Sequence, residues 1–229
     1  MKLLTTSNYK TLKGERMGIL TGILHLAPHR LSGHNVCPMA SKGCAASCLN
    51  TAGRGAFSTT QQARIRRTKM FFEEREMFMD MLRKDIASLR SKALKKGMRV
   101  AVRLNGTSDI NWVRFGLFEE FPDVQFYDYT KVYNRMMEGR PANYHLTFSR
   151  SESNDTFALD VLKKKVGNVA VVFDHLPTKW NGYDVIAGDE SDVRFIEGQG
   201  VVIGLLAKGK ARKDKSGFVV SAPTHFNNN

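Results

Sequence analysis

The sequence predicts an α/β fold with a mostly parallel sheet, and three observations point to it. From residue 98 onward, short apolar segments alternate with helical patterns, at roughly 20–25 residues per strand–helix unit. Each apolar segment is too short for a buried helix and is typical of a strand. No linker rich in Pro, Gly or Ser divides the chain, so we expect residues 1–229 to form one domain.

The first hundred residues contain one predicted strand and one long predicted helix. Residues 1–16 are polar, and we expect them to be irregular. The apolar segment "MGILTGILHLA" (17–27) predicts a buried strand, which Pro28 and Gly33 end. A helix is expected from Ser58 to Gly97, because apolar residues recur on one face at spacings of three, four and seven. These residues are Phe71, Phe78, Leu82, Ile86, Leu89 and Ala93.

The rest of the chain supplies about six strand–helix units. Strands are predicted at 98–105, 124–129, 144–149, 169–174, 183–187, 193–196, 201–207 and 217–222. Helices are predicted at 112–121, 131–138 and 156–166. Right-handed crossovers wind such a sheet in one direction, which favours a partial (β/α)6-type barrel. A doubly wound open sheet is the competing topology, and the tail 223–229 is expected to be frayed.

The composition favours a basic protein with anionic partners. Lys and Arg number 35 against 22 Asp and Glu, a formal net charge of +13. This charge fits a nucleic acid or an anionic small molecule, although the basic clusters also suit solvated loop tips. The start of the chain does not resemble a signal peptide, and no apolar run reaches the ~20 residues of a membrane span. Three cysteines cannot form a disulfide framework, so we expect a cytoplasmic protein.

Polar segments follow five of the predicted strands. They are "NGTSD", "DYTK", "SRSES", "DHLPTK" and "KGKAR". In a parallel sheet these strand ends share one edge, where α/β proteins place their sites. Asp109, Lys131, Arg150 and Asp174 are therefore candidate site residues. Taken singly, each also has a structural explanation, such as capping the helix that follows.

All three cysteines lie in the loop 34–55 after the first strand. Cys37 and Cys44 are separated by six residues, and Cys44 and Cys48 by three. Three thiolates can hold three irons of a 4Fe–4S cluster and leave the fourth iron open. Tetrahedral zinc is the second reading, with His34 as the fourth ligand. Three inert buried thiols are the third reading, which the Gly-, Ala- and Ser-rich loop does not favour.

The cysteine loop and the partial barrel together resemble the radical S-adenosylmethionine superfamily, although its usual spacing is Cys-x3-Cys-x2-Cys. The resemblance implies a 4Fe–4S cluster on Cys37, Cys44 and Cys48. It also implies that the cluster's open iron binds S-adenosylmethionine. The end of the strand 98–105 then lies near the amino group of this cofactor, and the next two strand ends receive its carboxylate or a substrate anion. These positions are Asn105, Gly106, Thr107, Ser108, Asp109, Lys131 and Arg150.

Nearly the whole chain resembles the gene product 88-like family of phage proteins. The similarity runs through "LAPHRLSGHNVCPMASKGCAASCLNTAGRG", "ARIRRTKMFF", "VRLNGTSDINW", "FYDYTK", "VIAGDESDVRF" and "GLLAKGKARKDKSGFV". This family resemblance implies a viral or prophage origin, and hence the host cell cytoplasm. It implies no particular reaction.

Three functions remain open at this stage. The first is a radical enzyme that cleaves S-adenosylmethionine. The second is a non-catalytic iron–sulfur protein, which carries electrons from a donor or senses redox state. The third is a zinc-bearing nucleic-acid binder, for which affinity should fall as salt rises.

Overall fold

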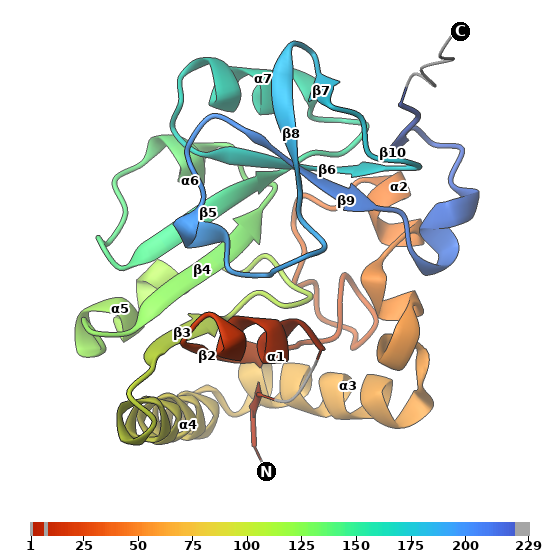
Figure 1. The fold of residues 1–229 in the computed structure, drawn as a ribbon. Coiled ribbons are helices and arrows are strands. Elements are labelled where there is room, and N and C mark those ends of the chain that lie inside the picture. The colour runs from red at the N-terminus through yellow and green to blue at the C-terminus, as the bar shows by residue number, and fades with distance from the viewer. Residues whose placement is uncertain (1, 7–8, 223–229) are drawn as a thin grey trace, which may run out of the picture.

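A large, mostly parallel sheet organises the chain in a computed structural model that describes residues 2–6 and 9–222 (Figure 1). The tail predicted to fray, 223–229, lies outside the described residues. The strands are β1 Leu4–Thr5, β2 Ile19–Leu24, β3 Arg99–Arg103, β4 Gln125–Thr130, β5 Tyr144–Ser149, β6 Asn168–Phe173, β7 Lys179–Trp180, β8 Tyr183–Ala187, β9 Val202–Leu206 and β10 Val219–Val220. The α-helices are α1 Tyr9–Arg16, α2 Lys42–Ala46, α3 Ser58–Glu73, α4 Arg75–Lys95, α5 Leu117–Glu120, α6 Asn134–Met137 and α7 Asp155–Lys163.

The sheet order is β1-β2-β3-β4-β5-β6-β9-β8-β7, with β10 beside β6. Every pair from β2 to β6, and then β6–β9 and β8–β9, is parallel, whereas β1 and β7 are antiparallel to their neighbours. The predicted mixed α/β fold with a mostly parallel sheet is thus confirmed. The sheet is not closed into a barrel, and its order from β2 to β6 follows the chain.

Most predicted elements are present, with four corrections. The expected strand 193–196 is wrong, because Arg194–Ile196 form the 3-10 helix η4. The prediction that residues 1–16 are irregular is also wrong, because this segment contains β1 and α1. The single long helix is two helices, because Glu74 has φ −135° and ψ 52° and separates α3 from α4. The helix expected at 112–121 is likewise interrupted, by Gly116 in the left-handed region between η3 (Trp112–Phe115) and α5.

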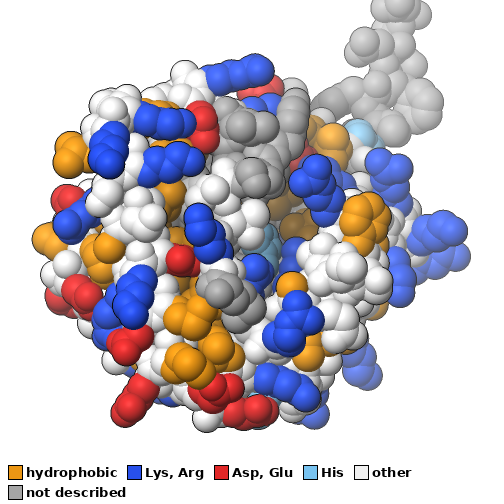
Figure 2. Space-filling model, turned by 90° about the horizontal axis from the view of Figure 1, so that it is seen from below, with side chains coloured by type: hydrophobic (Ala, Val, Ile, Leu, Met, Phe, Trp, Pro, Cys, Tyr) orange, Lys and Arg blue, Asp and Glu red, His pale blue; other side chains and the backbone are white. Residues whose placement is uncertain are grey.

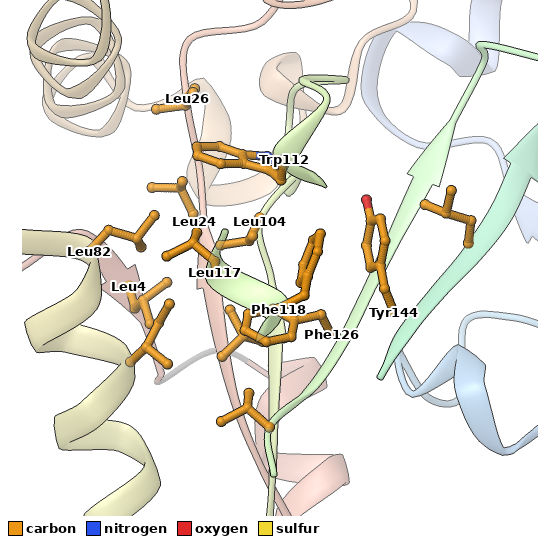
Figure 3. Packing of buried hydrophobic residues seen from close by; sticks show 14 of the residues in the cluster. Leu4, Leu24, Leu26, Leu82, Leu104, Trp112, Leu117, Phe118, Phe126 and Tyr144 are labelled. Carbon is orange, nitrogen blue, oxygen red and sulfur yellow. The ribbon is translucent and has the colours of Figure 1, made fainter. Parts of the chain in front are cut away.

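Alternating side chains of the central strands enter two apolar clusters on opposite faces of the sheet. Leu20, Val102 and Phe126 belong to the larger cluster, and Ile19, Ala101 and Tyr127 to the smaller one. Figure 3 shows the larger cluster, in which Leu24, Leu104, Trp112, Phe118, Phe126 and Tyr144 point toward one another. α4 packs on the larger-cluster side of β1, β2 and β3, and α1 packs against β2 (Figure 1). Among the described residues, no helix is both long enough and apolar enough to cross a membrane.

Gly22 marks the closest approach of α4 and β1 to strand β2. A Cβ atom at this position would lie 2.7 Å from Leu89 Cδ2 and 3.2 Å from Leu4 Cδ1. Gly22→Ala should therefore force the layers apart and lower the free energy of unfolding by about 1–3 kcal/mol. Urea denaturation measures this loss. Gly139→Ala is the control, because a Cβ there meets no atom within 4 Å; equal stability of the two variants would contradict the prediction.

Candidate functional site

The candidate site lies at the edge of the sheet where the parallel strands end. In Figure 1 the cysteine loop (orange) and the segment after β9 (blue) lie beside these strand ends. The loop after β3 is joined to the chain that leaves β2 by three hydrogen bonds. Gly106 N donates to Leu24 O (3.0 Å), Thr107 Oγ1 to Leu26 O (2.6 Å) and Asp109 N to Val36 O (2.8 Å). The structure thus brings the cysteine loop and the 105–109 loop together.

The three cysteines are free, and each is partly buried. The Cys37 Sγ atom accepts a hydrogen bond from His29 N (3.3 Å) and lies 3.8 Å from Thr107 O. Cys44 lies in α2, whose N-cap Ser41 accepts a hydrogen bond from Cys44 N (3.1 Å). Cys48 precedes the short 3-10 helix η1, Leu49–Thr51. The sequence therefore places the three thiols in one loop at the rim of the sheet.

The thiols influence one another electrostatically. Burial raises the pKa of Cys37 to about 12, and the neighbouring Cys48, Asp109 and Cys44 add to the increase. Burial also raises the pKa of Cys48, with a contribution from Cys44, whereas Arg64 and Lys131 oppose the increase. Without a bound metal these two sulfur atoms therefore favour the neutral thiol. A coordinated metal would reverse that preference, because it binds the thiolate.

The donor atoms suit a soft metal centre, but they are not arranged as a finished one. Across residues 2–6 and 9–222, no group of three or more His, Cys, Asp or Glu side chains is positioned to hold a metal ion. His34, the predicted fourth zinc ligand, stacks on Phe72 with ring centroids 4.3 Å apart. Its Nε2 atom lies 3.2 Å from Glu73 Oε1. His34 is thus held by α3, and this arrangement does not favour the zinc reading.

Asn105 organises the loop after β3. Its Oδ1 atom accepts hydrogen bonds from Ser108 Oγ (2.8 Å), Ile110 N (2.9 Å) and Trp112 Nε1 (3.0 Å). Its backbone N–H donates to the fully buried Asp128 (2.6 Å). Asn105 and Ser108 therefore bond to their own loop and strand.

Asp109 and Arg150 are likewise engaged within the protein. Asp109 accepts hydrogen bonds from Thr130 Oγ1 (2.9 Å), Lys131 N (2.8 Å) and Arg135 (2.8 Å). Burial raises its pKa, and these three partners oppose the increase. Arg150 pairs with Asp155 (2.6 Å) and donates to the carbonyl oxygens of Gly217 and Phe218. Both side chains fasten neighbouring segments of the rim. The fourth strand-end candidate, Asp174, accepts from Ala222 N (3.1 Å) and pairs with His175 (2.7 Å).

Lys131 differs from the other predicted residues. Its Nζ atom donates to Ser149 Oγ (2.6 Å) and lies 5.6 Å from the centre of the Phe218 ring. Within the described part of the chain, no carboxylate pairs with it. Its electrostatic effect on Cys48 places this charge near the thiols.

Arg64 is a residue of the site that the sequence reasoning missed. It is only 8% exposed and donates to Asn50 Oδ1, and its buried Nε atom has no hydrogen-bond partner among the described residues. Its electrostatic coupling to Cys48 places it near the thiols. Arg64 belongs to the basic segment "RIRRTK" (64–69), whose charge fits an anionic partner and equally suits a solvated face. A signal was present, because Arg64, Thr68 and Phe71 share one face of α3, and all three are buried.

The surroundings of Arg64 are strongly positive. The pKa of His25 falls to about 3, through burial and the nearby charges of Arg64, Arg103 and Arg67. Arg103 has a carboxylate partner, Asp192, at 2.9 Å. Figure 2 shows Lys and Arg side chains spread among uncharged side chains over the face seen from below, with the acidic side chains mainly toward the left and the lower edge. This potential favours a negatively charged occupant at the rim.

Comparison with known proteins gives one match. The family model described as gene product 88 matches residues 2–222, nearly the whole chain. No curated protein and no solved structure matches significantly.

Glu152 connects the cysteine loop to the loop after β5. Its carboxylate accepts from Gly43 N (2.7 Å) and Ser41 Oγ (2.8 Å). Glu152→Ala removes both charge-assisted bonds, so we expect a loss of about 1–3 kcal/mol in unfolding free energy. Hydrogen exchange at residues 41–48 should become faster. Glu119→Ala is the control, and exchange equally slow in both variants would show that Glu152 does not hold the loop.

Asp128 should make stability depend on pH. Burial raises its pKa from 3.8 to about 7, although the Asn105 N–H favours the carboxylate. Between these pH values the native state keeps a proton that the unfolded chain releases, so the free energy of unfolding falls as pH rises. Asp128→Asn should remove this contribution. Urea unfolding from pH 4 to 8 should show that the free energy of unfolding of Asp128→Asn rises relative to that of the wild type up to about pH 7. A difference in unfolding free energy that does not change with pH would contradict the prediction.

Proposed function

The chain belongs to the gene product 88 family, and we propose that it holds an iron–sulfur cluster of the 4Fe–4S type on Cys37, Cys44 and Cys48. One observation carries the proposal. The three partly buried thiols lie in one loop, and two cations without a carboxylate partner among the described residues, Arg64 and Lys131, act electrostatically on Cys48. The family description points to a phage gene product, so the proposed compartment is the host cytoplasm.

Charge balance links these observations. Burial of an arginine without a counter-charge is costly. Three thiolates outweigh the positive charge of an oxidised 4Fe–4S core, so the assembly is anionic and would offset part of the positive charge of Arg64 and Lys131. In return, the two cations would stabilise the thiolates that metal binding requires. Three inert thiols would leave Arg64 without a negative partner among the described residues, whereas Lys131 still interacts with the charge of Asp109.

The backbone also supports cluster ligation. The backbone N–H of His29 donates to the Cys37 sulfur, and the backbone N–H of Asn50 donates to the Cys48 sulfur. Such hydrogen bonds tune the potential of iron–sulfur clusters. Because the sulfur atoms are not preassembled around one point, the proposal requires the loop 37–48 to adjust on binding.

A further step of the proposal is radical chemistry on S-adenosylmethionine. Two features motivate this step, because the resemblance to the radical S-adenosylmethionine superfamily implies them. They are the sequential order of the strands from β2 to β6 and the position of the cysteine loop after the first parallel strand. When bound, the cluster would supply one electron for cleavage of S-adenosylmethionine. In this proposal Lys131 would receive the carboxylate of this cofactor. Asn105, Gly106, Thr107, Ser108, Asp109 and Arg150 would hold the surrounding loops in position.

The second candidate is a non-catalytic electron carrier or redox sensor. The observation that favours it is the internal bonding of Asn105, Asp109 and Arg150, whose polar groups already have partners within the protein. In this case the open iron would take a small thiol, water or a side chain, and an electron donor would be the partner.

Anaerobic reconstitution of the full chain with ferrous iron and sulfide tests the cluster. We expect about four irons and four sulfides per chain, with a paramagnetic signal after reduction. Serine at any of the three cysteine positions should reduce the iron content. A colourless protein with one zinc, or iron binding that survives replacement of all three cysteines, would overturn the proposal. Release of 5′-deoxyadenosine from S-adenosylmethionine separates the enzyme from the carrier.

Arg64 should raise the reduction potential of the cluster. Arg64→Gln removes a buried positive charge next to Cys48, so reduction, which adds an electron, becomes less favourable. Redox titration followed by paramagnetic resonance should show a more negative potential. Arg66→Gln is the control, because Arg66 lies on the same helix and is exposed. Equal reduction potentials in the two variants would show that the charge of Arg64 does not act on the cluster.

A further inference from the structure

A second feature lies beside the cysteine loop: a groove of about 460 Å³ that we call the arginine–phenylalanine groove. Its lining includes Val36 and Pro38 on either side of Cys37, and Phe72, Arg75, Arg114 and Arg135. The volume lies in the range of small-molecule sites.

Arg75 is held in the groove by aromatic rings. Its Cζ atom lies 3.9 Å from the centre of the Phe71 ring and 5.4 Å from that of Phe115. Its Nε atom donates to Phe71 O, and its two terminal nitrogens have no hydrogen-bond partner among the described residues. A guanidinium that is fixed by stacking and has free N–H groups is well suited to bind a phosphate.

Arg114 adds a second available cation. It is exposed and forms no ion pair within the part of the chain that the structure describes. Arg135 contributes less, because Asp109 pairs with it at 2.8 Å. Glu138 also lines the groove, but neither Arg75 nor Arg114 pairs with a carboxylate among the described residues, so the groove presents two guanidinium groups without an ion-pair partner.

The groove also offers an aromatic surface. Phe72 is 37% exposed, and its ring stacks on His34 with centroids 4.3 Å apart. Phe115 is partly buried and lies 5.5 Å from the Trp112 ring. Aromatic faces next to guanidinium groups are the combination that binds nucleotides, through base stacking and phosphate contacts.

We propose that the arginine–phenylalanine groove binds a nucleotide, with its phosphate on Arg75 and Arg114 and its base against Phe72. The nucleotide is either a free mononucleotide or one unit of a single-stranded nucleic acid. The net charge of +13 favours both. The inference does not rest on the proposed cluster, because none of the three thiols takes part in it.

The opposite edge of the sheet provides a matched comparison. A groove of equal volume, about 460 Å³, lies at the amino ends of β3 and β4 and is lined by Arg90, Arg99 and Asp123. There Arg90 already pairs with Asp123 at 3.4 Å, and no phenylalanine lines the groove. Size and positive charge alone therefore do not distinguish the two grooves, whereas available guanidinium groups and aromatic rings do.

Fluorescence anisotropy with a labelled single-stranded oligothymidine tests the proposal on the full chain. The Arg75→Gln/Arg114→Gln double variant should raise Kd at least tenfold, whereas Arg90→Gln leaves it unchanged. Phe72→Leu should weaken binding without changing the salt dependence, because it removes stacking and no charge. Circular dichroism checks that each variant is folded.

Competition with unlabelled AMP and thymidine monophosphate identifies the source of the nucleotide. Displacement at micromolar concentrations indicates a free nucleotide, and tight oligonucleotide binding without displacement indicates a single strand. Absence of binding to all probes at moderate salt would overturn the proposal. So would equal losses in the Arg90→Gln and double variants, which would mean diffuse attraction. Repeating the titration with all three cysteines replaced by serine separates this result from the cluster.

Discussion

The hydrogen bonds between the loop after β3 and the chain leaving β2 determine the arrangement of the whole rim. Asp109 is central, because its N–H bonds to Val36 O while its carboxylate holds Lys131 N and Arg135. One residue, through its backbone N–H and its carboxylate, thereby joins the cysteine loop, the loop after β3 and the loop after β4. Gly106 permits this contact, since a Cβ there would lie 2.6 Å from Leu24 O. The parallel strands bring the segments to one edge, and these bonds join them.

Most of the predicted polar side chains at the rim are hydrogen-bonded within the protein, but two of its positive charges have no carboxylate partner among the described residues. Asn105, Asp109 and Arg150 have partners within the protein, whereas Arg64 and Lys131 lack carboxylate partners in the described ranges. A fold that needed charge only for structure would place a carboxylate beside Arg64, as Asp192 lies beside Arg103. Uncompensated buried charge is costly, and it is most readily explained when an anionic group completes the site.

The sequence predicts the strands well because they are buried in a parallel sheet and read as short apolar runs. It also predicts that the polar segments after these strands lie at one edge of the sheet, because the carboxyl ends of parallel strands share an edge. It fails at η4, where "VRFI" is compatible with a strand although Arg194 is fully buried and pairs with Glu197. It fails at α1, which is too polar to show a periodic apolar face.

Site residues were harder to predict than their location. The strand-end positions identify Asn105, Asp109 and Arg150, but only the folded chain shows that each of these groups bonds to other residues of the protein, Ile110, Lys131 and Asp155 respectively. Arg64 was missed because a run of basic residues resembles a solvated surface. Its neighbours on the same helical face, Thr68 and Phe71, show otherwise. Periodicity of a charged segment thus carries information that its composition does not.

The two proposed sites share a short peptide. Val36 and Pro38 line the arginine–phenylalanine groove, and Cys37 between them directs its sulfur toward Thr107 O instead. A ligand that displaces this peptide must also move the Cys37 sulfur relative to Cys44 and Cys48. Adjustment of the cysteine loop and occupation of the groove therefore act on the same backbone, and linkage requires any such effect to be reciprocal. A nucleotide in the groove and a metal on the thiols would each alter the affinity for the other if they favour different positions of Val36–Pro38.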